Sequence, residues 1–216
     1  MKAVVLLSGG LDSTVAAWLA AREMELVLAL TCDYGQRAAE AEIRAAGEVA
    51  SALAIPQRVV PLGWVGAVAD DALTSSGRPL PHPTVEQLTG DDAETSAAAV
   101  WVPNRNGLLV NVAAVYAEPL GCQGIVCGFN AEEAATFSDN SQGFVNAANV
   151  FFAYSTRGRL ELVCPTLEMT KVQIVRIGRE VGAPLDLVWS CYEAGPQPCW
   201  RCESCVRLRR ALDEAG

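Results

Sequence analysis

Short apolar runs alternate with amphipathic stretches along the first 60 residues. Residues 3–7 form a continuous, β-branched-rich run, and residues 26–31 and 57–60 form two more, as expected of strands buried on both faces. A stretch at helical spacing follows the first run, and another covers residues 39–53. Strand–helix–strand alternation favours a parallel sheet with right-handed crossovers. We therefore expect an α/β fold with a Rossmann-like parallel sheet.

The pattern changes between residues 63 and 100. Clusters such as Thr74-Ser75-Ser76-Gly77 and Thr89-Gly90-Asp91-Asp92 predict a long loop with one short helix near residues 65–73, either a lid or a surface insertion. Beyond it, Thr170 and Gln173 have the spacing of a helix capping box. We expect one domain over residues 1–188, followed by a small segment over 189–216. The remaining predicted elements are helices at 108–118, 143–154, 170–181 and 204–212, and strands at 125–127 and 160–163.

The charge balance narrows the classes of partner. Asp and Glu number 25 against 16 Lys and Arg, which gives a net charge of −9. The chain therefore lacks the basic footprint of a nucleic-acid-binding protein. It also lacks an apolar run of about 18 residues, and its first apolar run is too short for a signal peptide. We expect a cytoplasmic protein with neither nucleic-acid nor membrane partners.

A glycine-rich loop follows the first predicted strand. Its sequence is Ser8-Gly9-Gly10-Leu11-Asp12-Ser13-Thr14. A turn at a strand–helix junction aims backbone N–H groups at an anion, and the three hydroxyls can contact phosphate oxygens. Because the loop has no lysine it is not a Walker A loop, and it suits the holding of pyrophosphate. Asp12 is expected to face solvent, where it holds a cation or orients the loop. The alternative is an ordinary strand–turn–helix joint with a capping aspartate.

The eight cysteines divide into two groups. The first, Cys32, Cys122, Cys127 and Cys164, lies among apolar neighbours and is expected to be buried. The second has the spacing C-x7-C-x2-C-x2-C near the C-terminus. Four thiolates saturate a tetrahedral zinc ion, which indicates a structural zinc knuckle, and the alternative is two redox-active pairs. The sole histidine, His82, rules out a multi-histidine site. The predicted zinc ligands are Cys191, Cys199, Cys202 and Cys205.

Three polar residues near predicted helix starts are candidates for ligand binding. Lys171 opens a helix, where a cation opposes the helix dipole, so it either contacts phosphate or is an exposed, solvated lysine. Arg105 and Asn106 follow a proline-stiffened turn. They either bind a planar polar base and a carboxylate, or serve as a surface arginine and a helix cap.

The glycine-rich loop resembles the signature of PP-loop ATP pyrophosphatases. Further motifs resemble the 7-cyano-7-deazaguanine synthase family within that group, in order along nearly the whole chain. They are Asp33-Tyr34-Gly35-Gln36-Arg37, Val102-Pro103-Asn104-Arg105-Asn106, Leu167-Glu168-Met169-Thr170-Lys171, Trp189-Ser190-Cys191-Tyr192 and the last three cysteines.

The resemblance implies an ATP-dependent ligase that converts 7-carboxy-7-deazaguanine and ammonia into a nitrile through acyl-adenylate and amide intermediates. Magnesium would accompany ATP, zinc would be structural, and we expect a homodimer. The implied catalytic residues are Asp12, Asp139 and Lys171. The implied ATP-binding residues are Ser8, Gly9, Gly10, Leu11, Asp12, Ser13, Thr14, Tyr34, Gln36 and Arg37, and the implied substrate-binding residues are Arg105, Asn106, Asn130 and Asp139.

Two positions depart from the family pattern. Ser141 stands where the family has an arginine, and Ala38 stands where it has a histidine. Three other functions stay open: a relative that passes the deazaguanine acyl group to another amine, a tRNA thiolase, and a non-catalytic nucleotide-binding module. The negative charge argues against the thiolase.

Overall fold

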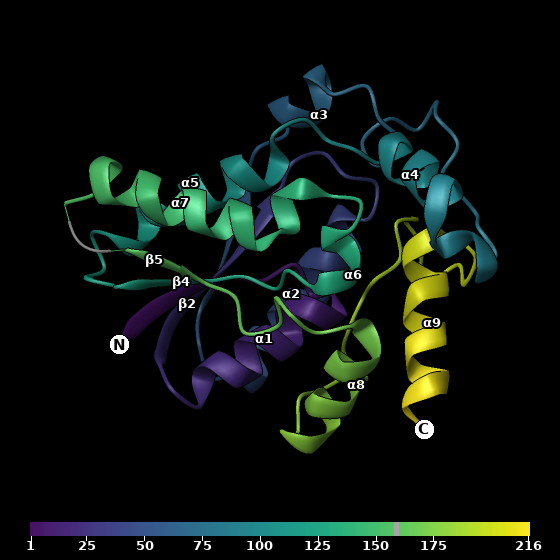
Figure 1. Ribbon diagram of the computed structural model, residues 1–216. Coiled ribbons are helices and arrows are strands. Elements are labelled where there is room, and N and C mark those ends of the chain that lie inside the picture. The colour runs from purple at the N-terminus through teal and green to yellow at the C-terminus, as the bar shows by residue number, and fades with distance from the viewer. Residues whose placement is uncertain (158–159) are drawn as a thin grey trace.

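A five-stranded parallel sheet forms the centre of the protein (Figure 1). The computed structural model describes residues 1–157 and 160–216. The chain runs from the centre of the sheet to one edge and then crosses back to the other side of β1, so the strand order is β3-β2-β1-β4-β5. Ligands of such sheets bind beyond the carboxyl ends of the strands, where the order reverses. The strands are β1 (Lys2–Leu6), β2 (Glu25–Asp33), β3 (Gln57–Pro61), β4 (Gly124–Val126) and β5 (Glu161–Val163).

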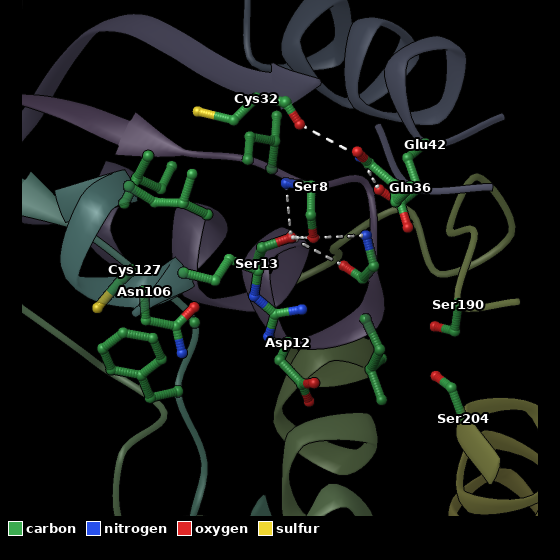
Figure 2. Close-up of a pocket in the computed structure, with 18 of the residues that line it drawn as sticks. Ser8, Asp12, Ser13, Cys32, Gln36, Glu42, Asn106, Cys127, Ser190 and Ser204 are labelled. Carbon is green, nitrogen blue, oxygen red and sulfur yellow. Dashed lines mark hydrogen bonds between the residues drawn. The ribbon is translucent and has the colours of Figure 1, made fainter. Parts of the chain in front are cut away.

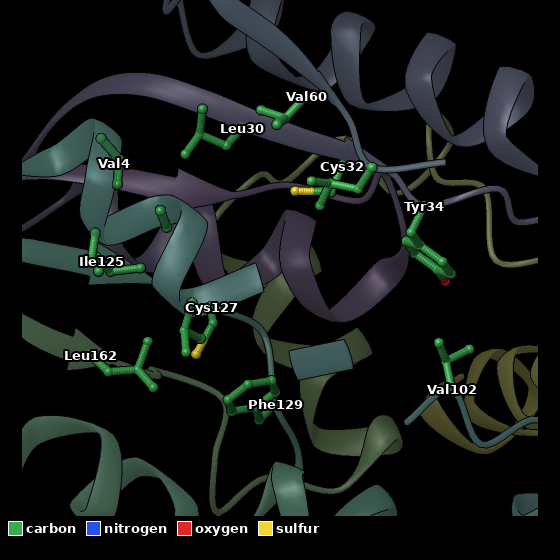
Figure 3. Close-up of a cluster of buried hydrophobic side chains, with 14 of the residues drawn as sticks. Val4, Leu30, Cys32, Tyr34, Val60, Val102, Ile125, Cys127, Phe129 and Leu162 are labelled. Carbon is green, nitrogen blue, oxygen red and sulfur yellow. The ribbon is translucent and has the colours of Figure 1, made fainter. Parts of the chain in front are cut away.

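Helices cover both faces of the sheet, which confirms the expected α/β class. Helices α1 (Leu11–Ala21) and α2 (Ala39–Ala52) pack on the face that carries Ala3 and Val5. Helices α5 (Arg105–Ala117) and α7 (Gln142–Ser155) pack on the other face. That second core joins residues of all five strands, among them Val4, Leu30, Val60, Ile125 and Leu162 (Figure 3). Burial on both faces explains why the strands are apolar without alternation.

Two further helices pair beside α1. Helix α8 (Lys171–Glu180) begins with the predicted capping box, in which Thr170 Oγ1 accepts from Gln173 N at 3.3 Å and Thr170 N donates to Gln173 Oε1 at 2.8 Å. Helix α9 (Glu203–Ala215) packs against α8 and closes the chain. The C-terminal segment is thus fixed next to the glycine-rich loop.

The segment 63–100 is more ordered than the sequence predicts. The expected helix near residues 65–73 is the shorter α3 (Trp64–Val68), and a 3-10 helix η1 (Glu86–Leu88) follows. The cluster Thr89-Gly90-Asp91-Asp92, expected in a loop, instead begins helix α4 (Gly90–Ala99), with Thr89 as the N-cap. Acidic residues in a first turn are favourable there because they face the positive end of the helix dipole. Inward-facing alanines give this helix little apolar periodicity, so the sequence conceals it.

Two short elements connect β4 to α7. They are helix α6 (Ala131–Ala134) and the 3-10 helix η2 (Ser138–Asn140), and neither was expected. Asn130 caps α6 by accepting from Glu133 N at 2.9 Å. No helix in the described parts of the chain has the length and apolarity needed to cross a membrane.

Candidate active site

A cavity of about 240 Å³ lies beyond the carboxyl ends of β1, β2 and β4. The glycine-rich loop forms one wall, and the lining also includes residues from β2, α2, α5, α6, α8 and the C-terminal segment. Figure 2 labels several of them, among them Gln36, Glu42, Asn106 and Ser204. The cavity lies at the position that the strand order predicts for a ligand. Its polar lining residues include Ser8, Asp12, Ser13, Gln36, Glu42, Arg105, Asn106, Glu133, Asn140, Lys171, Ser190, Tyr192 and Ser204.

Hydrogen bonds within the glycine-rich loop hold its hydroxyl groups in place. Ser8 Oγ and Ser13 Oγ lie 3.0 Å apart, and Gly10 N donates to Ser8 Oγ at 3.3 Å. The loop leads directly into α1, whose first N–H groups have no partner within the helix. The arrangement suits an anion such as a phosphate.

Two glycines allow this loop to pack closely against its neighbours. Gly9 has φ +80°, and a Cβ atom there would lie 2.7 Å from the backbone nitrogen of Ala46 in α2. Gly128 follows β4, and a Cβ atom there would lie 2.5 Å from Ser13 N. Both contacts are with backbone atoms, so relief would require the loop itself to move.

Replacing Gly128 by alanine is therefore expected to displace the loop. We expect the free energy of unfolding to fall by about 1–3 kcal/mol and ATP binding to weaken at the same time. Urea unfolding and equilibrium ATP titration measure the two effects. Gly143→Ala is the matched control, because a Cβ atom there meets only Ser141 Oγ at 3.5 Å. Equal behaviour of the two variants would contradict this account of Gly128.

A buried lysine joins the loop to α6 and α8. Lys171 is 5% exposed, and its Nζ lies 2.6 Å from Asp12 Oδ2 and 2.7 Å from Glu133 Oε1. The alternative of an exposed lysine is therefore wrong. The expectation that Asp12 faces solvent is also wrong, because its carboxylate pairs with a lysine 159 positions away. Asp12 Oδ1 has no hydrogen-bond partner among the described residues, so it is available to a ligand.

The two carboxylates determine the charge of this lysine. Burial disfavours the charged form of Lys171, but Asp12 and Glu133 outweigh that effect and raise its pKa. Burial likewise opposes ionisation of Glu133, yet Lys171 lowers the pKa of that carboxyl group. The site thus contains a permanent cation held between two carboxylates at the end of the glycine-rich loop.

The predicted ligand-binding residues divide into those that reach the cavity and those that do not. Tyr34, Gln36, Arg105 and Asn106 line it, together with Ser8, Gly10, Leu11, Asp12, Ser13 and Lys171. Helix α5 begins at Arg105 with Asn104 as the N-cap, so the alternative of Asn106 as a helix cap is wrong. Arg105 Nη1 donates to Tyr34 Oη at 3.3 Å, which places a cation in the part of the cavity lined by Tyr34.

Five predicted residues lie outside the cavity lining. Gly9 packs against the backbone of α2, and Thr14 is fully buried. Arg37 donates to the main-chain oxygens of Ser75 and Arg78, so it fixes the 63–100 segment. Asn130 caps α6, and Asp139 contributes its main-chain oxygen to Asn106 Nδ2 at 3.4 Å.

Sequence reasoning missed several residues that line the cavity. Glu42 accepts from Gln36 Nε2 at 2.8 Å, and burial raises its pKa. Asn140 lines the cavity where its neighbour Asp139 was expected, and Tyr192 closes the side nearest the cysteines. Glu133 was detectable in principle, because it follows β4 at the same edge of the sheet as Ser8.

The four C-terminal cysteines form a compact cluster. The Sγ atoms of Cys191, Cys199, Cys202 and Cys205 all lie within 4.8 Å of one another. Backbone N–H groups point at the sulfurs, as from Cys199 N to Cys191 Sγ and from Cys202 N to Cys199 Sγ, both at 3.3 Å. Such donors stabilise thiolates, so the cluster can hold a metal ion. Of the other cysteines, three are buried as expected and Cys164 is half-buried.

The cysteine cluster is connected to the glycine-rich loop. Trp189 N, two residues before Cys191, donates to Gly9 O at 2.8 Å, and Trp189 Nε1 donates to Cys191 O at 2.9 Å. The Arg44 guanidinium of α2 lies 6.0 Å from the centre of the Trp189 ring. Ordering the cluster therefore also positions the loop.

Comparisons with known proteins give a consistent result. Residues 2–216 match the model of the family described as "Queuosine biosynthesis protein QueC". The chain is 49% identical to a 7-cyano-7-deazaguanine synthase of Desulforudis audaxviator, covering 100% of this chain and 98% of that protein. It is 47% identical to one of Carboxydothermus hydrogenoformans, covering 97% of each. The solved structure of a 4-thiouridine synthetase in complex with RNA and ATP aligns at 21% identity with a TM-score of 0.49, covering 99% of this chain and 51% of that one.

Proposed function

Because the chain belongs to the family of the queuosine biosynthesis protein QueC, we propose that it converts 7-carboxy-7-deazaguanine, ammonia and ATP into 7-cyano-7-deazaguanine. The observation that carries the proposal is the cavity at the strand-order reversal, where a phosphate-type loop meets the buried Lys171. Full-length relatives named 7-cyano-7-deazaguanine synthase support the choice of substrate and product.

The first step activates the carboxylate. One of its oxygens attacks the α-phosphorus of ATP, the bond to the β-phosphate breaks, and pyrophosphate leaves. In this proposal, the first N–H groups of α1 and the Lys171 ammonium, which border the cavity, stabilise the charge that develops on the departing pyrophosphate. Since AMP is a good leaving group and a carboxylate oxygen is not, the acyl-adenylate is ready for substitution.

The same cavity then has to act on a neutral amide. Ammonia displaces AMP to give the amide, whose oxygen attacks a second ATP, and loss of AMP with two N–H protons leaves the nitrile. A cation near the reacting oxygens favours both adenylations. Ser141, which replaces the family arginine, instead caps α7 by accepting from Phe144 N at 3.2 Å. Arg105 and Lys171 both line the cavity and supply the cations that remain.

Two metal ions fit this proposal. The unpartnered Asp12 Oδ1 is the oxygen suited to magnesium, which would neutralise polyphosphate charge when ATP is bound. Zinc suits four clustered thiolates, because Cys₄ sites are closed and structural. In that role the ion would order the segment that binds the glycine-rich loop through Trp189.

The stoichiometry of nucleotide use tests the proposal. Purified protein with magnesium, ATP, ammonium and 7-carboxy-7-deazaguanine is expected to release two AMP and two pyrophosphate for each acid consumed. Chromatography of the nucleotides and a coupled pyrophosphate assay measure both. ATP use that does not depend on the acid, or tRNA-dependent release, would refute the proposed substrate.

We also propose that two chains associate through the outer face of α5 and α7. Val115 of α5 is 73% exposed, and Val150 and Tyr154 of α7 are 64% and 88% exposed. Exposed large apolar residues are common at interfaces, and a second copy of the chain is the occupant that the expected homodimer supplies.

Replacing Tyr154 by glutamate is expected to convert a dimer into a monomer, because burying a like charge from each copy is unfavourable. Light scattering after size exclusion measures the mass of the native protein and the variant. Glu168→Gln, a change at an exposed residue outside α5 and α7, serves as the control. A monomeric native protein, or a variant that remains dimeric, would contradict the proposed interface.

A further inference from the structure

A small chamber opens from the side of the main cavity. Its volume is about 40 Å³, and it shares Arg105, Glu133, Asn140, Tyr192 and Ser204 with the main cavity. It extends toward α9, where Glu203 and Arg207 line it, and the apolar Leu73, Val100 and Phe137 complete the lining. A cavity needs about 10–15 Å³ of such space to hold one water molecule, so the chamber admits molecules of that size and is too small for a nucleotide or a fused heterocycle.

The chamber is lined by a buried carboxylate of which only one oxygen accepts hydrogen bonds. Glu203 is 2% exposed, and its Oε1 accepts from Arg207 Nε at 3.0 Å and from Arg207 Nη2 at 2.8 Å. Its other oxygen, Oε2, has no hydrogen-bond partner in the described parts of the chain. An unpaired buried acceptor is unfavourable, so an N–H or O–H donor in the chamber would be stabilising.

The charges around the chamber favour a small donor. Arg207 is matched by Glu203, and the nearby Glu132, whose Oε2 lies 3.8 Å from Arg207 Nη1, is paired with Arg210. Arg105 faces Tyr34 and Asp139. Lys171, in contrast, is shared by two carboxylates, Asp12 and Glu133, which leaves negative charge beside the chamber mouth.

Resting on the proposed function, we propose that this chamber binds the nitrogen substrate, ammonium in equilibrium with ammonia, and presents it to the acyl-adenylate. Glu203 Oε2 accepts an N–H from the back of the chamber. The Ser204 hydroxyl, which points from α9 toward the cavity in Figure 2, is a second partner. Glu133 lines both spaces, and its Oε1 lies 2.7 Å from Lys171 Nζ in the main cavity.

The step that follows balances in atoms and charge. Ammonium first releases one proton to solvent. The lone pair of the resulting ammonia forms a bond to the acyl carbon of the adenylate, and the bond between that carbon and the phosphate oxygen breaks with its electron pair on AMP. The nitrogen then carries a positive charge and a readily lost proton. Glu133 accepts that proton, and the charged groups that face it are Lys171 of α8, Asp12 of α1 and Arg207 of α9.

Two variants test the chamber, one by changing its charge and the other by changing its volume. Glu203→Gln keeps the shape and removes the charge, whereas Ser204→Val keeps every carboxylate and fills the space. Each is expected to raise the KM for ammonium about 10- to 100-fold, as for loss of a hydrogen bond to a charged group. ATP–pyrophosphate exchange driven by the acid needs no ammonia, and in Glu203→Gln, at a residue outside the lining of the main cavity, it is expected to stay within about twofold of the native rate. Glu214→Gln, at an exposed site on the same helix, is the control.

A binding measurement completes the test without turnover. Ammonium chloride is expected to raise the thermal unfolding midpoint of the native protein above its value in sodium chloride at equal ionic strength, and Ser204→Val is expected to abolish that gain. If the native protein shows no acid-dependent ATP use, the proposed function fails while this measurement still tests the chamber. With function intact, an unchanged KM for ammonium in either folded variant would overturn the proposal. The proposal would also be overturned if potassium chloride raised the unfolding midpoint as much as ammonium chloride does and did not compete with ammonium as a substrate. The chamber would then be a structural cation site.

Discussion

Replacing Lys171 by methionine is expected to lower the rate of pyrophosphate release by about 10²–10³-fold or more. The lysine is a buried cation at the end of the phosphate loop, and methionine retains its apolar stem without the charge. Acid-dependent ATP–pyrophosphate exchange measures the loss at the adenylation step alone. Arginine at the same position is expected to restore little, because its planar fork does not fit between Asp12 and Glu133 as an ammonium does.

The same change should also cost stability, and the control separates the two effects. Methionine leaves Asp12 and Glu133 facing each other without a cation, at a cost of about 3–5 kcal/mol. Because the folded pKa of one carboxyl group then rises above its unfolded value, this variant should become more stable as the pH falls from 7 toward 5. Adding Asp12→Asn and Glu133→Gln should recover stability but not activity. Recovery of pyrophosphate release in that triple variant would contradict the catalytic role of Lys171.

Replacing Cys202 by serine is expected to destabilise the fold of the C-terminal segment, rather than to slow the chemical steps alone. Cys202 is fully buried among the four sulfurs, and a structural zinc site contributes its binding energy directly to folding. With one ligand in four lost, we expect the free energy of unfolding to fall by about 3 kcal/mol or more. That corresponds to about 6–12 °C in the midpoint of thermal unfolding for a chain of this size.

Metal content decides between zinc binding and redox pairing. The native protein is expected to contain one zinc ion per chain, and the Cys202→Ser variant less. Cys122→Ser, the same change at a buried cysteine outside the cluster, should keep the full zinc content. A native protein without zinc, in which the cluster cysteines form disulfides, would contradict the structural zinc site.

The sequence predicted the sheet well because its signals are local. Buried strands such as residues 3–7 and the capping box at Thr170 depend on near neighbours, and both are confirmed. Helix α4 was missed within the long loop predicted at residues 63–100. Its buried residues, Ala93 and Ala97, differ little in hydrophobicity from the residues on its exposed face. Elements stabilised by small inward residues are the ones that periodicity misses.

The site was harder to predict because its contacts join distant segments. Asp12 and Lys171 were each identified as functional, but nothing local shows that they pair, and the exposure expected of Asp12 was therefore wrong. Arg37 belongs to a recognised motif yet contacts main-chain oxygens of the 63–100 segment. Glu133 and Glu203 were missed because an acidic residue in a helix usually faces solvent. Tertiary packing buries Glu203, whereas Glu133 reaches the cavity with its side chain still 31% exposed.

The central claim is that this cavity makes a nitrile, and the mass of the product tests it most directly. The native protein is incubated with magnesium, excess ATP, 7-carboxy-7-deazaguanine and ¹⁵N-ammonium, and the deazaguanine products are followed by mass spectrometry over time. The account predicts that a labelled primary amide appears first and is then replaced by the labelled nitrile. A labelled amide that persists at long times, or an acyl group transferred to an amine of the protein, would contradict it.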